Sequence, residues 1–139
     1  NLCDEIFKKK IHNIIIYNGN VLELFDKIIK KNIFDSIWIL FPDPWPKKRH
    51  FKRRLINDVF IKRLISVIKR DGKIHIATDS QSYLRQILSS IYKFKNYFLW
   101  ENQIMDGWKF DLNKSPQTKY YKKAIKSNRK PFYIELKKL

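Results

Sequence analysis

The chain has 139 residues, of which 44% are hydrophobic and 15% aromatic, so it can bury the core of one domain and is not a disordered tail. Thirty Lys and Arg against thirteen Asp and Glu give a formal net charge of +17, which favours nucleic acid or an anionic membrane surface as partner. One cysteine and three histidines without metal-ligand spacing exclude an internal disulfide, predict no metal site and favour a reducing, cytoplasmic location. Because no apolar run approaches the ~20 residues of a membrane span, we expect no membrane insertion.

The apolar pattern of the first half alternates between strands and helices. Short apolar runs at 14–17, 36–41 and 73–78 predict three buried strands. Apolar residues at helical spacing predict helices over 21–28 and 52–69, between these strands. A strand–helix alternation of this kind predicts right-handed crossovers and a parallel sheet, and therefore an α/β fold.

The second half begins with a helix and then changes character. Asp79 or Ser80 can cap a helix that carries apolar residues up to position 91. Residues 97–100 and 132–136 read as two further strands, and the polar, basic stretch 101–130 between them predicts a long surface excursion without a clear helix. With no internal repeat or low-complexity linker, residues 1–139 are expected to form a single domain.

Polar side chains follow the three strands expected in the first half. Asn20 lies in the turn after the first strand, Asp43 follows the second and Asp79 the third. In an open parallel sheet, ligands bind beyond the carboxyl ends of the strands. A turn Asn, an Asp between prolines and a helix-capping Asp are ordinary local features, but their convergence on one edge favours a binding site.

The loop after the second strand leads directly into a basic block. Six of the eight residues from 47 to 54 are Lys or Arg, and three of the seven arginines of the chain lie there. The many lysines elsewhere are typical of a solvated surface. The basic block is therefore the part of the positive charge that indicates a binding site. Phosphate contacts from it would position an RNA, while Trp45 could either pack under the loop or stack near a base.

One segment reads Phe-Pro-Asp-Pro-Trp-Pro-Lys-Lys-Arg-His at 41–50, followed by Lys-Arg-Arg at 52–54. It resembles the signature of the bacterial tRNA (guanine-N7)-methyltransferases, the TrmB family. Ala-Thr-Asp at 77–79 and Thr-Lys-Tyr at 118–120 support the resemblance. It implies a Rossmann-like class I methyltransferase fold that uses S-adenosylmethionine, with a variable-loop guanine of tRNA as its target.

The same resemblance implies roles for individual residues. Asp43 would be the catalytic carboxylate and would also lie near the cofactor, together with Asn20. Substrate contacts would come from Lys47, Asp79, Thr118, Lys119, Tyr120 and Tyr121. RNA contacts would come from Arg49, His50, Phe51, Lys52, Arg53 and Arg54.

The sequence departs from the family pattern in three places. Asn20 stands where the family has an Asp, and Tyr121 stands where it has a Glu. No G-x-G occurs, so the glycine-rich cofactor loop is absent and we expect an N-terminally incomplete methyltransferase domain. A non-catalytic RNA-binding remnant of the fold, or another basic nucleic-acid-binding protein, therefore stays open as an alternative. The sequence does not decide between a monomer and a homodimer.

Overall fold

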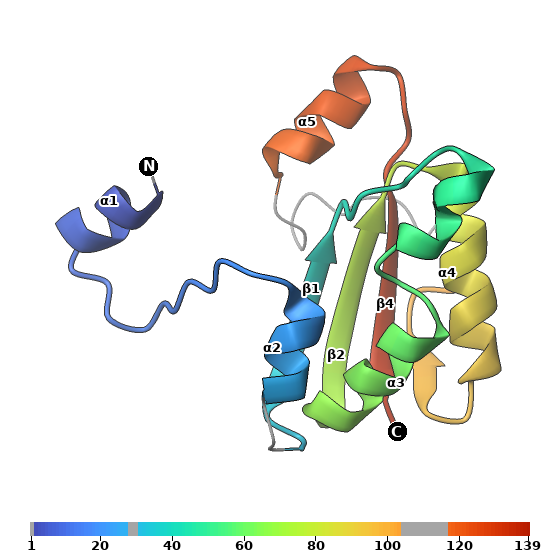
Figure 1. Ribbon diagram of the computed structural model, residues 1–139, viewed down its shortest axis with the longest axis horizontal. Helices are drawn as coiled ribbons and strands as arrows, with labels where there is room; N and C mark the ends of the chain where they lie inside the picture. The colour runs from blue at the N-terminus through green and yellow to red at the C-terminus, as the bar shows by residue number, and fades with distance from the viewer. Residues whose placement is uncertain (1, 28–30, 104–116) are drawn as a thin grey trace.

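A computed structural model describes residues 2–27, 31–103 and 117–139, apart from the side chain of residue 2 (Figure 1). The helices are α1 (Leu2–Lys8), α2 (Val21–Lys27), the 3-10 helix η1 (Lys48–Arg53), α3 (Asp58–Val67), α4 (Gln81–Lys93) and α5 (Lys119–Lys126). The strands are β1 (Phe34–Leu40), β2 (Ile68–Thr78), β3 (Phe98–Trp100) and β4 (Phe132–Lys138).

The four strands form one mixed sheet in the order β1-β2-β4-β3. β1 and β2 pair in parallel, which confirms the crossover expected between residues 36–41 and 73–78. β4 lies between β2 and β3 and is antiparallel to both. The expected α/β fold is therefore confirmed, while the wholly parallel sheet is corrected to a parallel pair with two antiparallel strands.

β2 is longer than the predicted strand because a bulge, rather than a turn, occupies its first half. The register with β1 jumps from Phe34 opposite Ile68 to Ser36 opposite Lys73. At the bulge Asp71 has a φ of 62°, and a Cβ on Gly72 would lie 2.8 Å from the carbonyl oxygen of Lys69. The strand resumes its pairing with β1 after the extra residues.

Side-chain caps decide where α3 and α4 begin. Oδ1 of Asn57 accepts a hydrogen bond from the Phe60 amide at 3.0 Å, so α3 starts at residue 58 and not at 52 as the apolar spacing predicted. Ser80 caps α4 by accepting from the Tyr83 amide, which leaves Asp79 outside the helix. Residues 48–53 form the separate turn η1 instead of the first part of α3.

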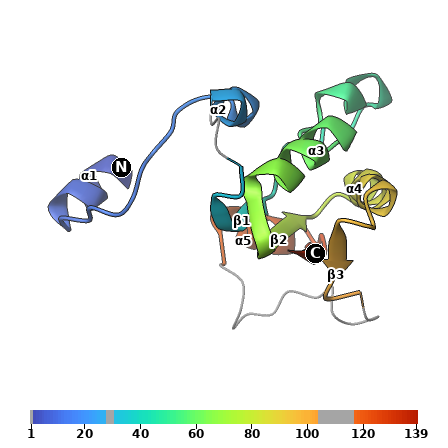
Figure 2. The same cartoon turned by 90° about the horizontal axis from the view of Figure 1, so that it is seen from below.

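Helices α2, α3 and α4 cover one face of the sheet, as the view from below shows (Figure 2). The core lies between them and is built from aliphatic strand residues and helix residues: Ile39, Ile74, Ile76, Ile134, Leu136, Phe25, Phe60, Leu64, Tyr83 and Ile87. On the opposite face the rings of Trp38 and His75 stack with centroids 3.8 Å apart. Among the described residues, no helix is long and apolar enough to cross a membrane.

The strand predicted at 14–17 is wrong. These residues form an extended connection between α1 and α2, away from the sheet (Figure 1), and Ile15 is 97% exposed. A strand is stable only when a neighbour accepts its hydrogen bonds, and none of the described strands pairs with this segment. The following helix is confirmed as α2; position 28, the last of its predicted apolar positions, lies outside the described residues.

Candidate functional site

Two of the three predicted strand ends meet at one edge of the sheet. β1 and β2 are neighbours, and the Phe41 amide donates to the carbonyl oxygen of Ala77 at 2.9 Å, which extends their pairing by one step. Asp43 lies in the loop after β1, and Asp79 follows β2 directly. The sheet therefore places the two predicted carboxylates on loops that leave adjacent strands side by side.

Asn20 does not belong to this edge through a strand. It is exposed and lies just before α2, where its Oδ1 accepts a hydrogen bond from the Leu22 amide at 2.9 Å. The prediction that Asn20 follows a strand is wrong, because the strand before it does not form. Its local role in this structure is that of a helix cap.

The loop after β1 has an unusual backbone. Phe41 and Trp45, on either side of Asp43, have φ values of 53° and 41°, in the left-handed region that residues with a Cβ adopt rarely. The Phe41 ring stacks on Tyr120 of α5 with centroids 6.4 Å apart. Such conformations concentrate at functional sites, and here they bracket the exposed Asp43.

Trp45 packs against the basic turn. Its ring meets His50 edge-on, with centroids 5.8 Å apart, and the guanidinium carbon of Arg53 lies 5.1 Å from its centroid. The side chain is half-buried. Of the two interpretations left open by the sequence, packing under the loop is the one seen here.

Arg54 corrects the predicted RNA-binding set. It is 1% exposed, and its guanidinium lies 3.5 Å from the centroid of the Phe51 ring. Nε donates to the carbonyl oxygen of Pro44 at 2.7 Å, and the Nη groups donate to Ser82 and to Oε1 of Gln86. A guanidinium enclosed in this way fixes the loop after β1 to the start of α4 and does not reach a phosphate.

The remaining basic residues of η1 stay at the surface. Lys47, Arg49, Lys52 and Arg53 are exposed, whereas His50 and Phe51 are half-buried. Nε of Arg49 donates to Nε2 of His50 at 3.3 Å. With the exposed Lys48, the structure thus keeps five cations beside the Asp43 loop, where they can meet a polyanion.

The predicted Thr118–Tyr121 segment opens a helix in a region expected to have none. Oγ1 of Thr118 accepts from the Tyr121 amide at 3.1 Å, so Thr118 caps α5. Lys119 and Tyr120 are exposed and Tyr121 is half-buried. Figure 1 shows α5 beyond the carboxyl ends of β1 and β2, the two strands that Asp43 and Asp79 follow in the chain.

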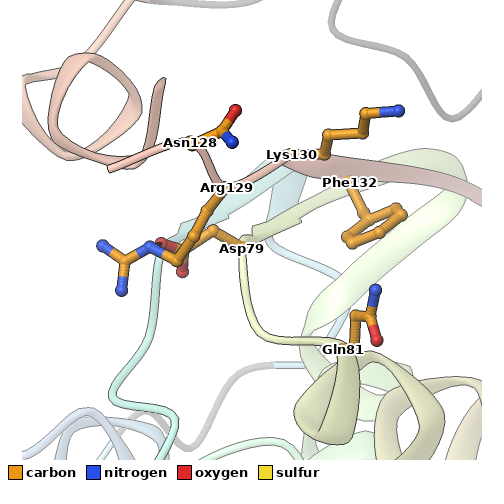
Figure 3. Close-up of a pocket in the computed structure, with 6 residues that line it drawn as sticks. All are labelled: Asp79, Gln81, Asn128, Arg129, Lys130 and Phe132. Atoms are coloured by element: carbon orange, nitrogen blue, oxygen red, sulfur yellow. Dashed lines mark ion pairs between the residues drawn. The ribbon is translucent and has the colours of Figure 1, made fainter. Parts of the chain in front are cut away.

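A cavity of about 480 Å³ opens next to Asp79 (Figure 3). It is lined by Asp79, Gln81, Asn128, Arg129, Lys130 and Phe132. Nε of Arg129 lies 3.0 Å from Oδ2 of Asp79. Because Thr78 pairs with Phe132 in the antiparallel register, the residue after β2 lies beside the residues before β4. Sequence reasoning missed Arg129, and only the pairing of β2 with β4 could have indicated it.

Comparison with known proteins agrees with this arrangement. Residues 1–134 match the model of a protein family described as "Putative methyltransferase". The chain belongs to this methyltransferase family. The resemblance carried by residues 41–54 is thereby confirmed.

Two relatives of this methyltransferase chain have the same protein name. The tRNA (guanine-N(7)-)-methyltransferase of Bartonella quintana is 35% identical over 132 residues, which cover 94% of this chain and 55% of the relative. The protein of the same name from Buchnera aphidicola subsp. Schizaphis graminum is 36% identical over 129 residues, covering 91% of this chain and 52% of the relative. The chain therefore spans about half the length of these curated relatives.

A solved structure supports the fold of the methyltransferase chain. A protein described in the same terms as the family, from Streptococcus mutans and in complex with SAH, superposes with a TM-score of 0.52 at 11% identity. The match covers 99% of this chain and 68% of that one. The expected Rossmann-like methyltransferase fold is confirmed.

Proposed function

We propose that the chain carries the substrate side of an S-adenosylmethionine-dependent tRNA (guanine-N7)-methyltransferase acting on a variable-loop guanine. The observation that carries this proposal is the position of Asp43 and Asp79 after adjacent parallel strands, with the exposed cations of η1 joined to the Asp43 loop. Relatives named for this reaction match most of the chain and support the choice of substrate.

The chemistry of the target suits two carboxylates without a strong base. N7 of guanine carries a free lone pair and accepts a methyl group without first losing a proton. The base becomes positively charged as the new bond forms, so a nearby carboxylate stabilises the product-like state. We assign this role to Asp43, and we assign to Asp79 the orientation of the base through its N–H groups.

Two exposed residues of the chain have polar groups available to the methyl donor. The exposed carboxylate of Asp43 can accept a hydrogen bond from the cofactor. The Oδ1 of Asn20 already accepts from the Leu22 amide, but the Asn20 amide nitrogen can still donate. When bound, S-adenosylmethionine supplies an electrophilic methyl group on a sulfonium. What the chain itself contributes is the placement and charge compensation of the base.

Docking of the RNA is assigned to η1 and to the start of α5. Lys47, Arg49, Lys52 and Arg53 are exposed next to the Asp43 loop, and Lys119 lies 5.3 Å from the centroid of the exposed Tyr120 ring. Arginine and lysine contacts to phosphates position a nucleic acid, and exposed aromatic rings can stack on unpaired bases.

The sequence also left a non-catalytic RNA-binding role open, and the relatives named for the methyl transfer do not favour it. Calorimetry with S-adenosylmethionine separates the two: clear binding to the chain contradicts the non-catalytic role. A general basic nucleic-acid-binding protein would bind duplex DNA as tightly as tRNA at matched salt.

The proposal is tested by incubating the protein with unmodified tRNA and isotopically labelled S-adenosylmethionine. We expect label at N7 of a variable-loop guanine, detected by nucleoside analysis after digestion of the tRNA. A tRNA with adenine at that position is the matched control and should gain no label. Labelling of another base, or of a different atom of guanine, would contradict the assignment.

A further inference from the structure

The carboxylate of Asp79 is held from one side. Nε of Arg129 contacts Oδ2 at 3.0 Å, and the Asp79 and Arg129 side chains are 19% and 50% exposed. Within the described residues, the contact found for the Asp79 carboxylate is this one, through Oδ2. Figure 3 shows the Arg129 guanidinium beside the Asp79 carboxylate and the Phe132 ring on the other side of the pocket.

The backbone around Arg129 is fixed on both sides. Asn128 follows the C-cap residue of α5, Ser127, in the left-handed conformation with a φ of 53°, and the Arg129 amide donates to the carbonyl oxygen of Ala124 at 2.9 Å. This hydrogen bond belongs to a common helix-terminating motif. After Arg129 the chain enters β4, where Phe132 pairs with Thr78. The position of the Arg129 backbone is therefore set by α5 and by β4 together.

A carboxylate that is held through one of its oxygens is suited to bind guanine. Guanine presents two adjacent donors, N1–H and the exocyclic amino group, and a carboxylate can accept both in a bidentate pair. Each carboxylate oxygen has two lone pairs, so Oδ2 can accept from Arg129 and from the base at once. Fixing the carboxylate before the base arrives removes part of the entropic cost of forming the pair.

We propose that Arg129 is a positioning residue for guanine recognition, holding Asp79 so that its carboxylate meets the N1–H and exocyclic amino group of a base bound in this pocket. The inference rests on the proposed function, because it takes guanine as the target. It adds a residue outside the recognised motifs and a way in which the end of α5 contributes to base selection.

Nucleotide discrimination tests this role directly. Inosine monophosphate lacks the exocyclic amino group of guanosine monophosphate but is otherwise the same probe. We expect the 139-residue chain to bind guanosine monophosphate about tenfold more tightly than inosine monophosphate, because the latter leaves one carboxylate oxygen unpaired. Arg129→Gln should bring this ratio close to one. Arg129→Lys keeps the charge but not the Nε–H, so its ratio should lie between the two.

Two further variants separate positioning from charge. Arg85→Gln removes one exposed positive charge from α4 and should leave the ratio unchanged. Asp79→Asn should abolish the preference, and adding Arg129→Gln to it should have no further effect on the ratio. Circular dichroism and thermal unfolding verify that every variant is folded.

The outcomes distinguish this inference from the proposed function. If Arg129→Gln weakens both nucleotides equally, or keeps the wild-type ratio, the positioning role is overturned while guanine recognition by Asp79 stands. If the wild-type chain shows no preference for guanosine monophosphate, the assignment of Asp79 to the base fails, and the inference fails with it.

Discussion

Nε of Arg54 donates a hydrogen bond to the carbonyl oxygen of Pro44 at 2.7 Å, and this contact joins the loop of Asp43 to the body of the domain. The same guanidinium donates to Ser82 and Gln86 at the start of α4. The loop after β1 and the helix that follows Asp79 thus share one buried cation. Arg54 links the two halves of the candidate site without being part of its surface.

Arg54→Ala should destabilise the domain by about 2–4 kcal/mol, because carbonyl and amide oxygens that accepted from a charged donor lose their partner in a buried position. Urea denaturation followed by circular dichroism measures the free energy of unfolding. Arg53→Ala is the matched control: its side chain is exposed and contacts the Trp45 ring, so its effect on stability should be small. Equal losses in the two variants would contradict a special role for Arg54.

The surface cations of η1 should control how tRNA binding depends on salt. Charge-neutral replacement of Arg49, Lys52 and Arg53 is expected to lower the slope of log affinity against log salt by about 0.7–0.9 for each phosphate that the protein no longer neutralises. Binding is measured by filter retention or fluorescence at several salt concentrations. Lys62→Gln, an exposed change on α3, is the control and should leave the slope unaltered. An unaltered slope in the triple variant would exclude η1 as the docking surface.

Asp43→Asn should lower methyl transfer to tRNA by about 10²- to 10³-fold, the usual cost of removing one electrostatic group from an active site. Because Asp43 is exposed, the substitution should leave folding and tRNA affinity close to those of the wild type. Single-turnover kinetics with saturating tRNA measures the chemical step. Asp35→Asn, an exposed carboxylate on β1, is the control for loss of one negative charge. Wild-type turnover by Asp43→Asn would rule out the role given to this carboxylate.

Much of the fold could be predicted from the sequence because its signals are local. The Ser80 cap and the apolar runs that became β1 and β2 depend on residues close together in the chain. Residues 14–17 carry the same kind of apolar run, but a strand also needs a partner, and that requirement is not visible in the run itself.

The candidate site shows the same limit. The motif at 41–54 indicated the family and placed Asp43, yet it did not separate Arg54 from the exposed Arg49 and Arg53. The partners that bury Arg54 lie on α4, 28 and 32 positions further along the chain. The contact between Asp79 and Arg129 likewise depends on the pairing of β2 with β4. Sequence patterns therefore identify residues with suitable functional groups, whereas side-chain burial and strand pairing decide which of these residues can face a ligand.

His75 should make stability fall at mildly acidic pH. Burial lowers the pKa of His75 below its ordinary value, and the Glu135 carboxylate opposes this shift only in part. Well above the ordinary histidine pKa of about 6.5 the imidazole is neutral in both the folded and the unfolded chain, so it adds no pH dependence there. Below that pH the unfolded chain binds the proton more readily, and stability falls until the pH passes the lowered pKa.

His75→Phe retains a ring that can stack on Trp38 but does not titrate. The decline in the free energy of unfolding between about pH 7 and the acidic range should therefore be shallower than in the wild type. Urea denaturation at a series of pH values provides the measurement. His12→Gln removes an exposed histidine from the segment before α2 and is the comparison variant. A His75→Phe curve parallel to the wild type would show that His75 does not cause the decline.

Tyr83→Phe should cost about 1–3 kcal/mol of stability although it removes one oxygen atom. The Tyr83 hydroxyl accepts a hydrogen bond from the Ile56 amide at 2.8 Å, and both residues are buried. Without that oxygen the buried amide loses its acceptor, and the cost of an unsatisfied buried donor outweighs the gain in hydrophobicity. Tyr92→Phe is the matched control, since Tyr92 lies on the same helix with a 69% exposed side chain. Thermal unfolding of both variants should show a clear loss for Tyr83→Phe alone; similar values would mean that water replaces the lost acceptor.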